Sequence, residues 1–301
     1  MPDVSSIAIC DYEGSPYRTA FWEGQGREFE DRAERIALRH LLPPGGRRLV
    51  EVGAGFGRLA DLYARFEQVI LLDYSRSLLR EARERLGSDP RIVYVAANVY
   101  QMPLGTGAVD TAVMVRVAHH LADVPCALRE LARIVCTGGA LVMEYANKRH
   151  LKSIARYALG RQRWSPFDPE PYEFAPLNFD FHPAWMSRRL REAGFQIERE
   201  RAVSHLRSGL LKRWFSGETL ARVDGWLQGP GAVVKLAPSV FVRARRAGSS
   251  PARLPDMCFR CPVCGVEPLT PEPAGLLCPA CYRLWPLRDG IYDFKSPDGD
   301  T

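Results

Sequence analysis

The chain has 301 residues, 46% of them hydrophobic and 25% charged, which is an ordinary composition for a globular protein with a sizeable core. Its formal net charge is +6 and comes mostly from arginine, because only five of the 41 basic residues are lysine; a charge of this size bears on non-specific association and excludes no fold. The sequence has no long uncharged apolar run and no signal-peptide pattern at its start, so we expect a cytoplasmic protein without a transmembrane segment.

The chain begins with an aromatic arm over residues 1–26 and continues into a helix. The arm's large aromatic side chains are Tyr12, Tyr17, Phe21 and Trp22. Taken alone, this composition is compatible with a loosely packed extension. Apolar residues then recur at helical spacing from 27 to 42, and Pro43 and Pro44 follow, which predicts one amphipathic helix that ends at these prolines.

A glycine-rich turn follows the first predicted strand. The apolar strand ends in Glu51, and the turn contains Gly53, Gly55 and Gly57. Glycine lets the backbone turn tightly and approach a ligand closely. The second predicted strand ends at Asp73, where an acid can hold a ribose diol. Together these features predict a site for a nucleoside-bearing cofactor. The nicotinamide pattern requires a small residue where this chain has an arginine, which disfavours that cofactor.

Five more predicted strands complete the pattern. They cover residues 91–98, 109–117 and 138–144, a segment that starts at 194, and residues 239–245. Segments with apolar residues at helical spacing lie between the first five strands. This alternation of strands and helices predicts a parallel sheet with helices on both faces. We expect the last strand to run antiparallel to the one before it.

Residues 27–204 resemble class I S-adenosylmethionine (SAM) methyltransferases of the type 11-like group. The resemblance is carried by the E-x-G-x-G-x-G segment, by residues 98–104 after the third strand and by the turn at 133–139. It implies an α/β fold with a seven-stranded Rossmann-like sheet. It also implies that SAM is bound by Glu51, Gly53, Gly55, Gly57, Asp73, Asn98 and Val99. The family usually has an aspartate where this chain has Asn98, whose amide oxygen can still accept a hydrogen bond from adenine.

The resemblance also indicates where a methyl acceptor would bind. In related enzymes an N-terminal segment forms a lid, which implies substrate contacts for Tyr17 and Trp22. The candidate general bases are His119, His120 and Glu144, although the histidine pair often has a packing or cofactor-contact role in this family. We expect Arg116, at the end of the fourth strand, to hold an anionic acceptor.

Two insertions follow the fifth strand, at 147–183 and at 205–238. Residues 147–163 carry six basic side chains and no acid, and a segment rich in proline and aromatic residues follows. The basic stretch is compatible with a nucleic acid or another anionic partner, with a membrane surface, or with a simple hydrophobic lid. The second insertion is expected to be helical.

Four cysteines near the end of the chain have the spacing of a zinc site. Cys261 and Cys264 form one C-x2-C pair, Cys278 and Cys281 form another, and 13 residues separate them. Such pairs bind structural Zn²⁺ tetrahedrally, and the alternative is a set of free or redox thiols. Cys258 is expected to be a spectator that could replace Cys261. The segment after the second pair resembles the small zinc-ribbon proteins that activate tRNA, rRNA and release-factor methyltransferases.

We therefore expect four parts: the arm or lid at 1–26, a methyltransferase domain at 27–245, a linker at 246–255 and a zinc ribbon at 256–301. The expected function is SAM-dependent methyl transfer to a small or lipid-like metabolite, or to RNA or a translation factor. The alternative is a non-catalytic zinc-ribbon binding module carried on a degenerate methyltransferase domain.

Overall fold

The computed structural model describes residues 6–248 and 258–296. Most of the predicted linker, the first five residues of the arm and both ends of the predicted ribbon therefore lie outside the described residues. Among the helices that are described, none is both long and apolar enough to cross a membrane.

Seven strands form the central sheet, in the order β3-β2-β1-β4-β5-β9-β8. Their bounds are Gly46–Val52 (β1), Phe66–Asp73 (β2), Ile92–Ala96 (β3), Val109–Met114 (β4), Val135–Ala146 (β5), Phe195–Val203 (β8) and Ser239–Arg246 (β9). The first five are parallel, and β9 runs antiparallel between β5 and β8. The predicted Rossmann-like class is confirmed, including the antiparallel last strand.

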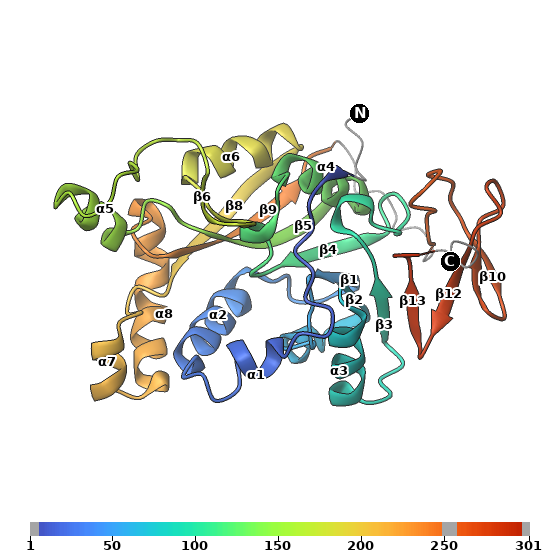
Figure 1. Cartoon of the computed structure of the whole chain (residues 1–301), viewed down its shortest axis with the longest axis horizontal. Coiled ribbons are helices and arrows are strands. Elements are labelled where there is room, and N and C mark those ends of the chain that lie inside the picture. Colours follow the sequence, from blue (N-terminus) through green and yellow to red (C-terminus); the bar gives the residue numbers. More distant parts are fainter. Residues whose placement is uncertain (1–5, 249–257, 297–301) are drawn as a thin grey trace.

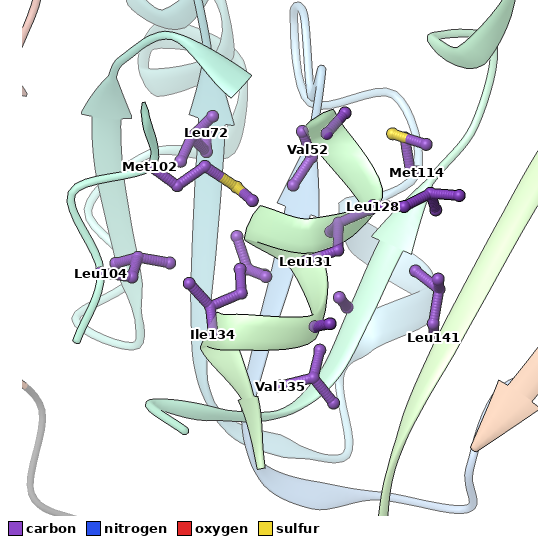
Figure 2. Packing of buried hydrophobic residues seen from close by; sticks show 14 of the residues in the cluster. Val52, Leu72, Met102, Leu104, Met114, Leu128, Leu131, Ile134, Val135 and Leu141 are labelled. Atoms are coloured by element: carbon purple, nitrogen blue, oxygen red, sulfur yellow. The ribbon is translucent and has the colours of Figure 1, made fainter. Parts of the chain in front are cut away.

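The two faces of the sheet pack against different helices, as Figure 1 shows. Alternate residues of β1 point to opposite faces, so Val50 and Val52 join one core and Leu49 joins the other. The first core is completed by α4 (Val124–Ile134) and α6 (Pro183–Glu192); Figure 2 shows Leu128 and Leu131 packed over Val52. The second core is covered by α2 (Glu28–Leu41), α3 (Arg76–Leu86) and α8 (Gly217–Val234).

Local chemistry sets the helix ends. Ser75 caps α3 by accepting a hydrogen bond from the Leu78 amide, and Asp123 caps α4 by accepting one from the Cys126 amide at 2.8 Å. The connection between β1 and β2 contains only a 3-10 turn, η2 (Ala60–Tyr63). A short 3-10 turn also follows β3 and β4: these turns are η3 (Val99–Gln101) and η4 (Ala118–His120).

The sheet is larger than the seven predicted strands because the cysteine-rich segment extends it. Strands β10 (Thr270–Glu272), β11 (Gly275–Leu277), β12 (Leu284–Arg288) and β13 (Ile291–Asp293) bring it to 11 strands. Strand β13 pairs parallel with β3, and the Phe294 amide donates to the Ala96 carbonyl at 2.8 Å. An uncovered β3 would expose a row of unpaired backbone groups, which β13 satisfies.

The two insertions lie at the opposite end of the sheet from β10–β13 (Figure 1). The first consists of α5 (Leu151–Ala158) and a hairpin of β6 (Tyr172–Ala175) and β7 (Asn178–Asp180). The second consists of α7 (Gly209–Trp214) and α8. They meet where the Leu151 amide donates to the Leu236 carbonyl, which brings the start of α5 to the end of α8. The arm contains one short helix, α1 (Tyr17–Phe21).

Candidate active site

Three glycines shape the turn after β1. All three have positive φ, from +53° to +74°, which side chains other than glycine rarely adopt. A Cβ on Gly53 would lie 2.1 Å from Cγ2 of Val117, and one on Gly57 would lie 2.9 Å from Cδ1 of Leu86. A Cβ on Gly55 would meet nothing within 4 Å. Gly53 and Gly57 thus allow close packing, whereas Gly55 borders open space.

Asp73, at the end of β2, is fixed beside this turn. Its Oδ2 accepts from the Gly55 amide at 2.7 Å, and its Oδ1 accepts from the Ser75 amide at 2.8 Å. Burial raises the pKa of Asp73 although both amides oppose that rise. The structure therefore brings the predicted acid and the predicted glycines together.

A cavity of about 750 Å³ lies at the carboxyl ends of the parallel strands, where open α/β sheets bind ligands. Its lining includes Gly53, Gly55, Asp73, Val99, Tyr12, Tyr17, Arg116 and His120. Asn98 is not among the lining residues, because its side-chain oxygen caps η3 by accepting from the Tyr100 amide at 2.9 Å. Sequence reasoning placed Asn98 correctly at the strand end but missed that its side chain is used locally.

Glu51 is a buried acid with an unused oxygen. Its side chain is 3% exposed, and Oε2 has no hydrogen-bond partner among the described residues. Burial raises the pKa of Glu51 to about 8, although the nearby Arg58 guanidinium opposes the rise. Glu51 borders a smaller hollow of about 330 Å³ that Gly53 and Gly55 also line. Such an orphaned acceptor suits a ligand that supplies a hydrogen-bond donor or a cation.

The arm covers this region. The Glu13 carboxylate accepts from the backbone amides of Arg76 and Ser77, at 2.7 and 3.0 Å, and so attaches the arm to the start of α3. Farther along, the Trp22 ring lies 3.8 Å from the Arg58 guanidinium and 5.0 Å from that of Arg116. Tyr17 and Trp22 line the smaller hollow together with Gly53 and Gly55.

The two histidines of η4 differ in their surroundings. The carbonyl oxygen of Leu177 can only accept, so Nδ1 of His120 must donate to it, at 2.9 Å. In neutral His120, Nε2 is therefore the acceptor, and the Tyr12 hydroxyl donates to it at 3.2 Å. Burial lowers the pKa of His120, and it lowers that of His119, whose Nδ1 has no partner, to about 3. Both histidines line the second cavity described below, but only His120 has partners for both ring nitrogens, which leave its Nε2 as a neutral acceptor.

Arg116 is not available as a free cation. Its Nε donates to the buried Glu34 carboxylate at 2.7 Å. Burial by itself would lower the pKa of Arg116, but the charge of Glu34 opposes burial, and the pKa rises. Its backbone amide donates to Oε2 of Glu144 at 3.0 Å, and its φ of +59° is unusual for a residue other than glycine. Arg116 therefore joins β4 to α2 and β5, a role that its position in the sequence does not indicate.

A second cavity of about 2,040 Å³ adjoins the first. Residues Tyr12, Tyr17, Arg116 and His120 line both cavities. Glu144 and both insertions contribute to the second one, together with Arg27 and His205. His205 was missed by sequence reasoning: its Nδ1 lies 3.1 Å from Oδ1 of the fully buried Asp224. Its partner is on α8, 19 residues away, so local spacing gave no signal.

Comparison with known proteins gives these cavities a context. Residues 50–143 match the family model described as "Methyltransferase domain". This part of the chain is similar to a methyltransferase domain. A protein of Mycobacterium tuberculosis, named "Probable S-adenosylmethionine-dependent methyltransferase", is 33% identical over 119 residues, which are 39% of this chain and 42% of that protein. The chain thus spans less than half the length of this relative.

Two solved structures share the fold of the methyltransferase domain. A SAM-dependent methyltransferase from Mesorhizobium loti is 24% identical, with a TM-score of 0.53 over 72% of this chain and all of that one. A Haloferax volcanii methyltransferase in complex with the Trm112 methyltransferase activator is 16% identical, with a TM-score of 0.51 over 75% of this chain and 95% of that one. At these identities the likeness concerns the fold.

A candidate metal centre lies beside the methyltransferase domain. The sulfur atoms of Cys261, Cys264, Cys278 and Cys281 all lie within 4.8 Å of one another. Two of the sulfur pairs are 3.7 and 3.4 Å apart. A tetrahedral ion with Zn–S bonds of about 2.3 Å places its sulfurs about 3.8 Å apart, so the four thiols fit zinc. Cys258 lies outside this group and packs against Gly105.

Proposed function

We propose that this protein is a SAM-dependent methyltransferase. The observation that carries the proposal is the junction of the two cavities: one borders the glycine turn and Asp73, the other is larger, and four residues line both. A donor in the first cavity would therefore face an acceptor in the second. The matched family model and the names of similar proteins support the same activity.

The first cavity fits the methyl donor. Gly55 leaves space for a ligand, Asp73 is fixed where a ribose would lie, and Glu51 has a free oxygen beside the turn. We assign cofactor contacts to Glu51, Gly53, Gly55, Gly57, Asp73 and Val99. Asn98 contributes by capping η3, which positions Val99 and Tyr100 in the cavity wall. When bound, SAM supplies an activated methyl group, so the protein needs mainly to position the acceptor.

His120 is our candidate for proton removal, rather than His119 or Glu144. Its Nε2 accepts a hydrogen bond from Tyr12 at the cavity junction, and an acceptor hydroxyl or amine could take the place of the Tyr12 hydroxyl there. The Leu177 carbonyl holds Nδ1–H and so keeps Nε2 free of a proton. Glu144 is turned toward the Arg116 amide, and we assign it a positioning role.

We propose a small or lipid-like acceptor in preference to RNA or a translation factor. The second cavity adjoins the first and is lined by elements of both insertions, an enclosed setting that suits a small or lipid-like molecule better than a nucleic acid. Residues 147–163 would then serve as part of the wall rather than as a nucleic-acid clamp. We also propose that 27–245 is the catalytic unit, that the arm at 1–26 is its lid and that the ribbon at 256–301 is a zinc-dependent structural support.

Calorimetric titration with SAM tests the cofactor assignment. We expect saturable binding that Asp73→Ala weakens by roughly tenfold or more, because a hydrogen bond to a charged group contributes about 1.5–3 kcal/mol. Asp89→Ala is the matched control, since Asp89 pairs with Arg91 away from this cavity. Absence of binding by all three proteins would favour the non-catalytic alternative, whereas equal affinities in all three would contradict the assignment of Asp73 alone.

Radiolabelled methyl transfer into fractionated cell extract tests the acceptor class. We expect label from tritium-methyl SAM in the solvent-extractable or small-molecule fraction. Label confined to RNA or protein would overturn the small-acceptor proposal while leaving methyl transfer intact.

A further inference from the structure

The wall of the larger cavity contains an arginine whose charge is not matched. Among the described residues, the Arg27 guanidinium has no ion pair and no hydrogen bond. It lies 5.8 Å from the Phe21 ring and 5.9 Å from the Trp22 ring, and it lines the cavity. Arg116, the arginine that the sequence suggested for an anion, is instead paired with Glu34. Arg27 therefore keeps five donors that no described group accepts from.

The acid that acts on Arg27 is already engaged by other cations. Glu30, one turn after Arg27, accepts from Lys212 at 2.7 Å with both oxygens and lies 3.4 Å from Arg207. Two cations thus share one carboxylate, and Arg207 lines the cavity too. Lys152, at the start of α5, adds a third cationic side chain to the same wall. This part of the cavity carries more positive than negative charge.

The neighbouring charges make the arrangement costly without a ligand. Burial lowers the pKa of Arg27, and the guanidinium groups of Arg116 and Arg207 lower it further, although Glu30 opposes them. Two acids, Asp180 and Glu144, also line this cavity, but among the described residues neither forms an ion pair with Arg27, and Glu144 accepts from the Arg116 amide. An anion placed between Arg27 and Arg207 would relieve this repulsion, and a guanidinium can bind a carboxylate or phosphate through two hydrogen bonds.

We propose that Arg27, assisted by Arg207 and Lys152, binds an anionic group of the methyl acceptor, a carboxylate or a phosphate. This inference rests on the proposed function and specifies its substrate class. The acceptor is then an anionic molecule whose charged end lies at Arg27, while the atom to be methylated reaches Tyr12 and His120 at the cavity junction. Phe21 and Phe174 in the same wall would contact its apolar part.

Binding measurements test the anion site without the natural acceptor. Hexyl phosphate, hexanoate and inorganic phosphate are titrated into the full-length protein by calorimetry. We expect Arg27→Gln to weaken binding of the anions at least tenfold, with partial recovery in Arg27→Lys. Arg32→Gln is the matched control, because Arg32 is on the same helix but pairs with Glu28 outside the cavity. Equal affinities in the wild type and Arg27→Gln would overturn the proposal.

The same titrations identify the kind of anion. Tighter binding of hexyl phosphate than of inorganic phosphate is the expected result, because the proposed acceptor has an apolar part, and equal binding of the two would contradict that part of the proposal. The label-transfer assay adds a second test: the labelled product should bind an anion exchanger, and Arg27→Gln should raise the apparent KM for extract at least tenfold. An uncharged product would overturn the proposal.

Failure of this inference can be told apart from failure of the proposed function. Arg27 does not line the first cavity, so SAM affinity should be the same in wild type and Arg27→Gln. Absence of SAM binding in the wild type would contradict the methyltransferase proposal. Normal SAM binding, together with anion affinities that are equal in the wild type and in Arg27→Gln, would contradict the anion site alone.

Discussion

Single residues decide how the cofactor turn and the histidine pair work. Gly53 allows the segment after β4 to pass close to the turn, and Gly55 presents its amide to Asp73. His120 owes its tautomer to a carbonyl from the β6–β7 turn, where Leu177 itself has a φ of +52°. Residues distant in sequence thus set the properties of the residues that the motifs predict.

Gly53→Ala should impair cofactor binding. An alanine there must adopt a positive φ and meets Val117, and such strain costs of order 1–3 kcal/mol, so we expect SAM affinity to fall by roughly tenfold or more. Calorimetric titration measures the effect. Gly209→Ala is the control, because its added methyl group meets nothing within 4 Å and needs no positive φ. Wild-type affinity in Gly53→Ala would contradict the packing argument.

His119 should make the protein sensitive to mild acid. Burial, with His120 and Arg116 nearby, lowers its pKa to about 3 in the folded state, whereas the ordinary value is 6.5. Below pH 6.5 the unfolded chain therefore binds a proton that the folded chain does not, so stability falls as pH falls. The slope is about 1.4 kcal/mol per pH unit from this group.

Urea unfolding at pH 7 and pH 5 measures this effect. In His119→Asn the loss of stability between the two pH values should be smaller than in the wild type, because asparagine does not titrate. His40→Asn, at an exposed position on α2, serves as the control and should behave like the wild type. An unchanged pH dependence in His119→Asn would show that His119 is not responsible.

At the scale of elements, the ribbon functions as an extra edge of the sheet. Strand β13 pairs with β3 directly before the residues that line the first cavity, and the bond from the Phe294 amide to the Ala96 carbonyl extends that pairing. Phe259, Trp285 and Phe294 stack together and connect the ribbon to the main core. So small a unit has little core of its own, and bound zinc would supply much of its folding free energy.

Removing zinc should therefore loosen the cofactor site. We expect the purified protein to contain one zinc ion, and Cys264→Ser or a strong chelator to lower both Tm and the metal content. SAM affinity should fall roughly fivefold or more, at the low end of couplings between linked sites. Cys258→Ser is the matched control, because Cys258 lies outside the four-cysteine group. Loss of zinc without any change in SAM affinity would show that the ribbon is independent of the site.

At the scale of the whole molecule, three distant parts of the chain meet beside the first cavity. Lys295, just after β13, lies 3.6 Å from Asp11 and 3.7 Å from Glu13 in the arm, and its ammonium lies 3.9 Å from the Tyr74 ring. The arm is attached to α3 by Glu13 and to η4 by Tyr12. These contacts connect the arm and the segment after β13 to elements of the central domain.

Ligand binding should therefore protect more than the glycine turn. Hydrogen exchange with and without S-adenosylhomocysteine should show slower exchange in residues 9–22 of the arm and in β13, as well as in residues 53–57, because a bound ligand stabilises every segment that closes the cavity. Strands β10 and β11, farther from the cavity, are the internal control. Protection restricted to residues 53–57 would contradict the coupling of arm and ribbon to the site.

The sequence by itself determined the succession of strands and helices along the chain, the glycine turn, the position of Asp73 at a strand end and the four-cysteine group. Each of these features depends on residues close together in the chain. Tertiary structure alone decided that the ribbon extends the sheet through β3, that Arg116 pairs with Glu34, which also pairs with Arg58, and that Arg27 has no ion pair among the described residues. It also brought Asp224 to His205 and Leu177 to His120. Whether a buried charge is matched depends on partners 19 to 82 residues away, and local spacing carries no information about such partners.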